Sequence, residues 1–220
     1  MVQYSCNHSL KNQIRANLEK SERIQINGDN LRRAAVAVTI VDYRGEGGVS
    51  GLLPVADNDA ALILTRRSLH LKNHAGQWAL PGGSRDTGEN PGQTAIRELS
   101  EEVGLFLPNK NILGYLDDFI TRSGFHITPV IIWAGTTVDL NPDPAEVASI
   151  HRIPCRELLR DDAPVLEKTD DPKHPILFMP IGTSWIATPT AAILYQFREV
   201  ALMGCQTRVA HFEQPYFAWK

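Results

Sequence analysis

The sequence has little cysteine, and its cysteines form no pattern that would hold a metal or a disulfide framework. Cys6, Cys155 and Cys205 are scattered through 220 residues, and no two of them form a CxxC pair. Small disulfide scaffolds and structural zinc sites need paired or closely spaced cysteines. The sequence therefore argues against both classes and favours a reducing, cytoplasmic compartment.

Long apolar runs are also missing. The N-terminal residues MVQYSCNHSLKNQIRANLEKSERIQING contain no signal-peptide core, and no segment is long and apolar enough to span a bilayer. The last residues, FAWK, differ from a peroxisomal signal of the SKL kind. We expect no membrane partner.

An excess of basic charge is missing too. Lysine and arginine number 22 and aspartate and glutamate 25, which gives a net charge of −3. Nucleic-acid-binding domains carry a basic footprint, so we expect no nucleic-acid partner. An anionic ligand would have to be held by a local group of residues or by bound cations.

The chain is 43% hydrophobic, which suits one compact domain. We expect an N-terminal helical appendage over residues 1–30 and a single domain over 31–220. Apolar residues at i, i+4 and i+8 predict an amphipathic helix over Leu10–Ile24, ending in a turn at 27–30. The residues of this stripe are Leu10, Ile14 and Leu18.

Several β-rich runs and a second long helix follow. We expect strands at 34–41 and 61–65, and further strands in ILGYLDDFI (112–120) and ITPVIIWAG (127–135) around a turn at 122–124. A last helix is expected over 188–204. Its apolar face would hold Ile193, Leu194, Phe197 and Ala201. Strands mixed with a few helices indicate an α/β fold whose sheet is covered on both faces.

The stretch GGSRDTGENPGQTAIRELSEEVGL (82–105) predicts a helix with sharp ends. Asn90 suits the N-cap, Pro91 the first helical position, and Gln93 the partner position of a capping box. Gly104 is placed to end the helix. We therefore expect a helix from Asn90 to Val103.

This helix places three carboxylates on one side. At 100° per residue, Glu98, Glu101 and Glu102 fall within an arc of roughly 100°, and the adjoining arc holds anchoring residues: Ile96, Leu99 and Val103. A solvated acidic face is the simplest interpretation. However, Glu98 and Glu102 repel each other at i, i+4 by about 0.2–0.5 kcal/mol, and we expect Arg97 to reach only Glu101.

Clustered carboxylates are the ligands that hard divalent cations require. Mg²⁺ takes oxygen ligands and commonly bridges to a substrate phosphate. The Gly82-Gly83 pair before the helix lets backbone carbonyls approach the same place, because glycine has no side chain in the way.

The pattern of this stretch resembles the box of the Nudix hydrolase superfamily. From Gly83 it has five residues, then Glu89, seven residues, and RELSEEVGL (97–105), so that every fixed position is filled. The resemblance implies a Nudix-type α/β/α sandwich with a mixed central sheet, from about Leu31 to the C-terminus. It also implies hydrolysis of a nucleoside diphosphate linked to another group.

The same resemblance implies roles for single residues. Glu98, Glu101 and Glu102 are expected to bind Mg²⁺ or Mn²⁺, near the Gly83 carbonyl. Arg97 and Glu89 are expected to form an ion pair that steadies the loop. The general base would be one of the box glutamates or Glu146 from NPDPAEVASIHRIP, for which a surface role is an equal alternative.

Four potential phosphate donors precede the box in LTRRSLHLKNHAGQWALPGG (64–83), namely Arg66, Arg67, Lys72 and His74. Guanidinium groups suit diphosphates, and lysine or histidine can hold a peripheral phosphate. A solvated basic loop is the alternative for Arg67 or Lys72 taken singly. For the whole set we expect substrate binding.

Three segments resemble the coenzyme A pyrophosphatase branch of the superfamily. They are the upstream stretch 64–83, HRIPCRELL (151–159) and WIATPTAAILYQF (185–197). Members of that branch cleave coenzyme A to 3′,5′-ADP and 4′-phosphopantetheine. The chain differs at Leu80, where the branch has Phe, and at Glu89, where it has Asp with one more residue before the Arg-Glu pair. ADP-ribose and NADH-type dinucleotides therefore stay open, and so does a nucleotide sensor that does not cleave its ligand.

The partner expected is a small-molecule nucleoside diphosphate derivative, and a homodimer is left open. The tail VAHFEQPYFAWK (209–220) is rich in aromatic residues. It could pack on the core, line the pocket or join a dimer, and core packing is the default expectation.

Overall fold

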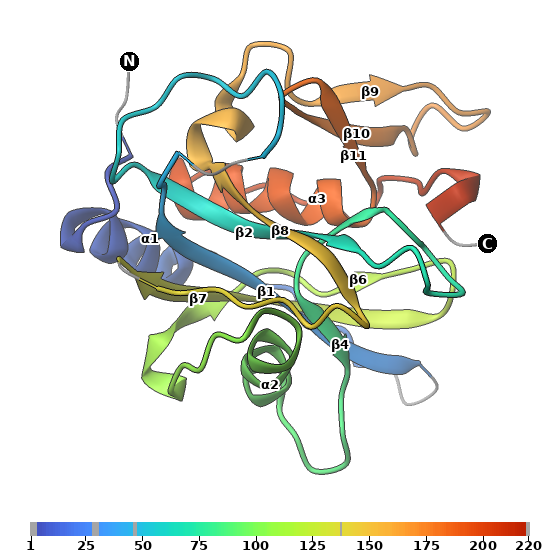
Figure 1. Cartoon of the computed structure of the whole chain (residues 1–220). Coiled ribbons are helices and arrows are strands. Elements are labelled where there is room, and N and C mark those ends of the chain that lie inside the picture. Colours follow the sequence, from blue (N-terminus) through green and yellow to red (C-terminus); the bar gives the residue numbers. More distant parts are fainter. Residues whose placement is uncertain (1–3, 28–30, 46–47, 137, 219–220) are drawn as a thin grey trace.

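The structure, a computed structural model, describes residues 4–27, 31–45, 48–136 and 138–218. Within these ranges a mixed sheet of eight strands forms the centre of the molecule (Figure 1). Its strands are β1 (Arg32–Asp42), β2 (Ala60–Arg67), β3 (Trp78–Ala79), β4 (Gly82–Ser84), β5 (Ile112–Tyr115), β6 (Phe119–Ile120), β7 (Phe125–Gly135) and β8 (Val147–Pro154). The strands expected at 34–41 and 61–65 are confirmed as β1 and β2.

Strand β1 runs through the middle of this sheet. It pairs in parallel with β7 and antiparallel with β2 and β4, while β8 pairs antiparallel with β2. A strand buried on both faces has a nearly continuous apolar sequence, which explains the run AAVAVTIV. The strand predicted in ILGYLDDFI (112–120) forms two short strands, β5 and β6, which are separated by Leu116–Asp118.

Helices cover both faces of the sheet. On one face, α2 (Pro91–Val103) buries Ala95, Leu99 and Val103 against Ala37 and Ile63. On the other face lie α1 (His8–Lys20) and α3 (Thr190–Gln196), which share a core with alternate residues of the same strands. The α/β fold with a mixed, doubly covered sheet is thus confirmed.

A second, smaller sheet was not predicted from the sequence. It consists of β9 (Val165–Glu167), β10 (Ile176–Ile181) and β11 (Ser184–Ala187), in the order β11-β10-β9. Leu177, Met179 and Ile181 of β10 lie in the core that contains α3. Short 3₁₀ helices occupy Asn109–Asn111 (η1), Cys155–Leu159 (η2) and Tyr216–Ala218 (η4).

Helix α1 buries Leu10, Ile14 and Leu18 as expected, but it ends at Lys20 rather than near Ile24. The backbone N–H of Ile24 donates to Asp117 Oδ1 at 2.7 Å, and that of Ile26 donates to Asp118 Oδ2 at 2.9 Å. These bonds hold the segment in a non-helical form, because a helix would bind the same N–H groups to its own carbonyls. The helix prediction was wrong at this end.

The last helix also departs from expectation in its second half. Its apolar residues Ile193, Leu194, Phe197 and Ala201 are buried as predicted. The α-helical part ends at Gln196, and Phe197–Leu202 form a π-helix (η3). Two side chains of α1 bind its last carbonyls, Gln13 to Leu202 O and Asn17 to Ala201 O, both at 2.9 Å, and so satisfy acceptors that a helix end leaves open.

Some sequence-based expectations fall outside the description. Of the turn at 27–30, residues 28–30 lie outside the described residues, and so do residues 46–47 of the glycine-rich stretch RGEGG (44–48), which follows β1, and Trp219 of the tail. Among the helices that are described, none is both long and apolar enough to cross a membrane.

Candidate active site

Helix α2 carries the carboxylates, and its local sequence fixes where it starts and stops. The Asn90 side chain accepts from the Gln93 N–H at 3.0 Å, and the Gln93 side chain accepts from the Asn90 N–H at 2.9 Å, which is the predicted capping box. Gly104 ends the helix with φ +69°, a conformation that glycine adopts without steric cost. Both predicted ends of the helix are confirmed.

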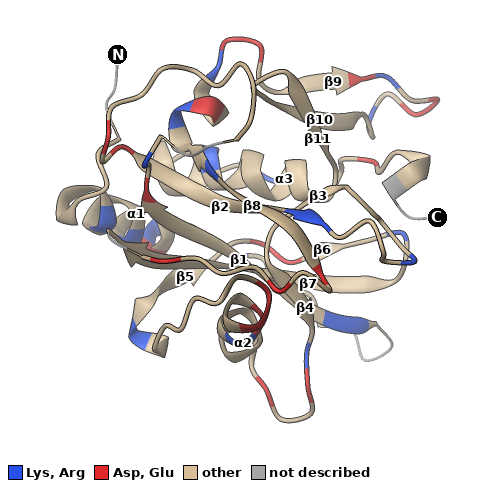
Figure 2. Ribbon diagram, viewed as in Figure 1, with Lys and Arg blue, Asp and Glu red and all other residues tan. Residues whose placement is uncertain are grey.

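Two of the three box carboxylates face a cavity of 640 Å³ next to the sheet, together with Gly82 and Gly83. Glu102 is only 4% exposed and accepts from the Gly82 N–H at 3.2 Å. Glu146, in the loop before β8, lines the same cavity. Figure 2 shows acidic residues on α2 and at the start of β8, near basic residues at the end of β2.

The carboxylates of this cavity are only partly compensated by nearby guanidinium groups, Arg97 at Glu98 and Arg67 at Glu102. Burial, with the nearby Glu98 charge as the next cause, raises the pKa of Glu102 to about 8. Burial also raises the pKa of Glu98, which is partly offset by its contacts with Arg97. Glu146 contributes repulsion to both. Grouped carboxylates whose ionised forms are disfavoured are a feature of sites that bind a cation or move a proton.

Arg97 is bound on several sides at the outer edge of α2. Its guanidinium donates to Glu89 Oε1 at 2.9 Å, Glu98 Oε1 at 2.9 Å, Glu101 Oε2 at 2.8 Å and the Ser84 carbonyl at 3.0 Å. The expectation that Arg97 reaches only Glu101 was wrong, since it also contacts the neighbouring Glu98. These contacts lower the pKa of Glu89 to about 2, chiefly through the hydrogen bond from Arg97.

Glu101 lies apart from the other two box carboxylates. Its side chain is 58% exposed, contacts Arg97, and is absent from the cavity wall. In the described ranges, no three His, Cys, Asp or Glu side chains are grouped closely enough to hold an ion. The geometry thus brings Glu98, Glu102 and Glu146 into one cavity and leaves Glu101 at its outer edge.

The donor set nevertheless fits a divalent cation. Carboxylate oxygens are the preferred ligands of Mg²⁺ and Mn²⁺, and buried Glu102 lies near the charge of partly buried Glu98. Gly83 permits this arrangement, because a Cβ at that position would lie 2.4 Å from Glu98 Oε1. The backbone at Gly83 therefore lies close to Glu98, while a role of the Gly83 carbonyl in binding a cation stays a prediction.

The upstream basic residues divide into two groups. Arg66, Arg67 and His74 line the cavity. Arg67 has a buried Nε without a hydrogen-bond partner among the described residues. Burial and the Arg67 charge lower the pKa of His74. Lys72 is exposed and lies outside the cavity wall.

Arg66 is the most tightly held of these residues. Its guanidinium carbon lies 4.0 Å above the centroid of the Trp78 ring, and it donates to Gly76 O at 3.0 Å and to Ser184 Oγ at 3.1 Å. Ser184 belongs to β11, so Arg66 connects the large sheet to the small one. Burial lowers the pKa of Arg66.

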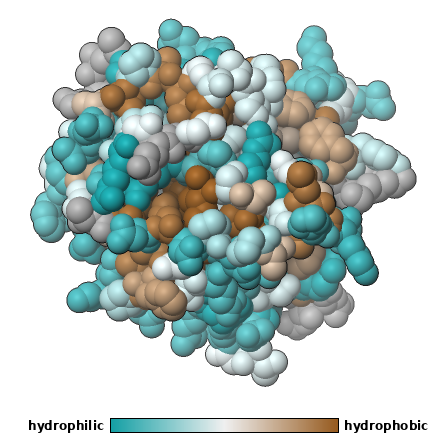
Figure 3. Space-filling view, viewed as in Figure 1, coloured by the Kyte–Doolittle hydropathy of each residue, from teal (hydrophilic) through white to brown (hydrophobic). Residues whose placement is uncertain are grey.

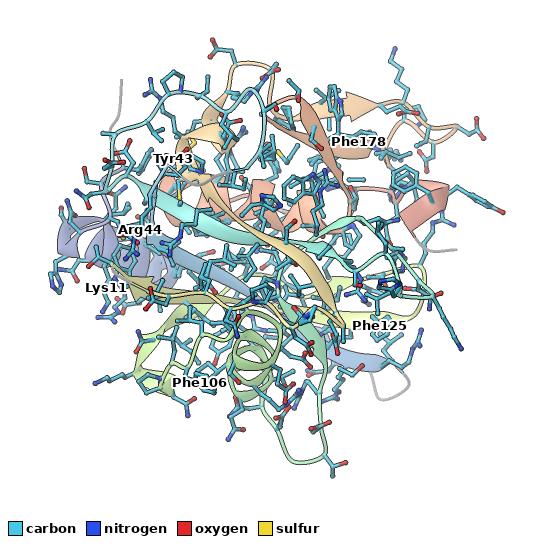
Figure 4. All side chains as sticks on the ribbon, viewed as in Figure 1. Lys11, Tyr43, Arg44, Phe106, Phe125 and Phe178 are labelled. Atoms are coloured by element: carbon cyan, nitrogen blue, oxygen red, sulfur yellow. The ribbon has the colours of Figure 1, made fainter. Side chains whose placement is uncertain are left out.

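A hydrophobic part of the cavity wall was missed by the sequence analysis. It includes aromatic residues from five separate elements, which no local pattern could bring together: Trp78, Phe125, Phe178, Trp185 and Phe217. Figure 4 labels Phe178 on β10 and Phe125 at the start of β7, at the upper and lower right of the view. In the tail, core packing holds for Phe212, whereas Phe217 lines the cavity.

Comparison with known proteins agrees with this geometry. Residues 46–173, more than half of the chain, match the family model described as NUDIX domain, so the chain belongs to the Nudix family. It is 38% identical over 111 residues to "Uncharacterized Nudix hydrolase NudL" of Yersinia enterocolitica, covering 50% of this chain and 57% of that protein. The protein of the same name from Pectobacterium atrosepticum is 35% identical over 138 residues, covering 61% and 72%.

Among solved structures, a MutT/nudix family protein from Enterococcus faecalis superposes with a TM-score of 0.52 at 16% identity, covering 81% of this chain and 65% of that one. This likeness supports the fold. The matched region spans a little over half of the Yersinia protein and about three quarters of the Pectobacterium protein.

Proposed function

We propose that the chain is a divalent-cation-dependent pyrophosphohydrolase that cleaves a nucleoside diphosphate derivative. The main observation in support is that Glu98, Glu102 and Glu146 line one cavity together with Arg67 and His74. Grouped carboxylates beside a guanidinium suit a diphosphate that binds with cations. Family membership supports the same conclusion.

The residues divide the work of such a reaction. Glu98, Glu102 and the Gly83 carbonyl would hold Mg²⁺ or Mn²⁺, with Glu101 joining them if its side chain leaves Arg97. When bound, the cation supplies charge neutralisation of the diphosphate and acidification of the attacking water. Arg67 would bind phosphate oxygens through charge-assisted hydrogen bonds, and His74 could donate a further hydrogen bond from its imidazole N–H.

A carboxylate must accept the proton of the attacking water. We propose Glu146 for this step, because it lines the cavity from the loop before β8 and forms no ion pair with any described residue, whereas Arg97 contacts Glu98 and Glu101. The Ser68 N–H donates to the Glu146 carbonyl at 2.8 Å and fixes the loop that carries the side chain. Arg97 and Glu89 would orient the carboxylates rather than touch substrate.

Coenzyme A or an acyl-coenzyme A is the substrate we propose, with 3′,5′-ADP and 4′-phosphopantetheine or its acyl derivative as products. The segments that resemble that branch include residues at the cavity wall, from Arg66 to Ala79 and from Trp185 to Thr190. The 3′-phosphate of coenzyme A would use a cationic side chain beyond those needed for the diphosphate. We place the reaction in the cytoplasm, in keeping with three free cysteines.

Product analysis by mass spectrometry tests this proposal. The purified chain is incubated with coenzyme A, acyl-coenzyme A, ADP-ribose, NADH and nucleoside triphosphates, each with Mg²⁺ and with Mn²⁺. Release of 3′,5′-ADP from coenzyme A is the expected result. Cleavage of ADP-ribose or NADH, with coenzyme A left intact, would make that compound the substrate in place of coenzyme A. Binding without cleavage would favour a nucleotide sensor.

A further inference from the structure

The small sheet has an unusual outer face. Residues that pair directly across an antiparallel sheet point to the same side. Phe178 pairs with Val165 on one neighbour and with Ala187 on the other, and Pro180 pairs with Trp185. All five are apolar or aromatic. The opposite face of β10 already supplies Leu177, Met179 and Ile181 to the core.

An antiparallel sheet with one face on a core is commonly polar on its other face. Here the outer face instead continues into the cavity, because Phe178, Trp185 and Ala187 line it. Trp185 is 56% exposed. Figure 3 shows hydrophobic residues at the surface near the small sheet, at the upper right of the view.

A second exposed aromatic side chain comes from the other end of the fold. Phe217 in η4 is 55% exposed and lines the same cavity. Its carbonyl accepts from Gln77 Nε2 at 3.2 Å, which ties the tail to the loop that also carries His74. Within the described ranges, no aromatic ring and no cationic side chain stacks on Trp185 or Phe217.

We propose that Trp185 and Phe217 bind the nucleobase of the substrate by stacking. Every substrate considered above carries an adenine ring or another base, and each base has a flat face that an aromatic side chain can cover. The carboxylates and Arg67 account for the diphosphate, and this aromatic part of the wall accounts for the base. The inference rests on the proposed function for the identity of the rest of the substrate.

A comparison of AMP with ribose 5-phosphate separates the contribution of the base to binding from that of the sugar phosphate. Both are titrated calorimetrically into the full chain with Mg²⁺, and neither has a diphosphate bond to cleave. Trp185→Ala should weaken AMP binding by about five- to 150-fold and leave ribose 5-phosphate unchanged. Trp185→Phe should keep AMP binding within about threefold. The control Phe106→Ala alters an 81% exposed side chain outside the cavity and should change neither.

Fluorescence gives a readout that a purely structural role would not move. AMP should quench indole emission in the wild-type chain and in Phe217→Tyr, and the quench should be much smaller in Trp185→Phe although AMP still binds, with Trp78 as the remaining indole of the cavity wall. Equal AMP affinity in Trp185→Ala and the wild type overturns the inference. It is also overturned if Trp185→Ala weakens the binding of acylated 4′-phosphopantetheine alone and leaves the binding of AMP unchanged. If no diphosphate is cleaved but Trp185→Ala still loses AMP, the proposed function fails and the stacking site stands.

Discussion

Arg66 and Trp78 donate to the same hydroxyl oxygen. Arg66 Nη2 lies 3.1 Å and Trp78 Nε1 2.9 Å from Ser184 Oγ, and the guanidinium stacks on the indole at 4.0 Å. One serine of the small sheet thus fixes two residues of the large sheet. These contacts fix Arg66 in the cavity wall, and phosphate binding by its guanidinium stays a prediction from the sequence.

Ser184→Ala should destabilise the protein, because it removes the acceptor of two partly buried donors. Unpaired buried groups cost about 1–3 kcal/mol each, so we expect a loss of at least 1 kcal/mol in urea unfolding. Thr183→Ala is the matched control, since its hydroxyl is exposed and lies 3.3 Å from Ser50 O. Equal stability of the two variants would mean that the shared hydroxyl contributes little.

Arg67→Ala should raise KM more than it lowers kcat. The Arg67 Nε is buried without a partner in the described structure, so this guanidinium has capacity left for a ligand. A hydrogen bond to a charged group contributes about 1.5–3 kcal/mol, which predicts an increase of roughly ten- to 100-fold in KM. Exposed Lys72, replaced by alanine, serves as the control. Steady-state kinetics with a fall in kcat alone would place Arg67 elsewhere in the reaction.

Helix α2 was predictable because its information is local. Its start is set by three neighbouring residues, Asn90, Pro91 and Gln93. Its end is set by Gly104, directly after the last helical residue. The box carboxylates follow from the spacing on that helix. What the spacing could not show is that Glu101 is held outside the cavity by Arg97, since side-chain direction depends on tertiary contacts.

Strand β8 and the small sheet escaped prediction for identifiable reasons. In β8, Arg152 is buried and donates to Asp42 Oδ1 at 2.8 Å, so a charged residue interrupts the apolar pattern. In β10, both faces carry apolar residues, which removes the alternation that marks a strand. The cavity wall needs side chains such as Phe125 and Phe217, whose proximity depends on the whole fold.

Glu102→Gln should remove most turnover while keeping the fold. Loss of a cation ligand removes electrostatic stabilisation worth several kcal/mol, so kcat should fall by at least about 100-fold. In EDTA above pH 8, where Glu102 with its pKa of about 8 is ionised, the variant should be at least as stable as the wild type, because it has one fewer buried charge near Glu98. Mg²⁺ should raise the melting temperature of the wild type only. Wild-type rates in the variant would show the cation assignment to be wrong.

The Glu89–Arg97 pair predicts a pH dependence of stability. The hydrogen bond from Arg97 lowers the folded-state pKa of Glu89 from 4.5 to about 2. The stabilisation is therefore present above pH 4.5 and is lost as the pH falls towards 2. Glu89→Gln should reduce stability at pH 6 and lose less on acidification to pH 3 than the wild type does. If the urea midpoints of Glu89→Gln and of the wild type fell equally between pH 6 and pH 3, the assignment of this pH dependence to Glu89 would be wrong.

Gly83→Ala should impair catalysis by moving Glu98 instead of unfolding the chain. The added Cβ would lie 2.4 Å from Glu98 Oε1, and the end of a side chain moves more easily than backbone. A displacement of about 1 Å at a reacting centre can cost on the order of 100-fold in rate. Ser84→Ala is the matched neighbour, because its exposed side chain can be removed while its carbonyl still accepts from Arg97. The prediction fails if Gly83→Ala retains full kcat, or if its melting temperature falls as far as its activity does, since collapse of the fold would then explain the loss.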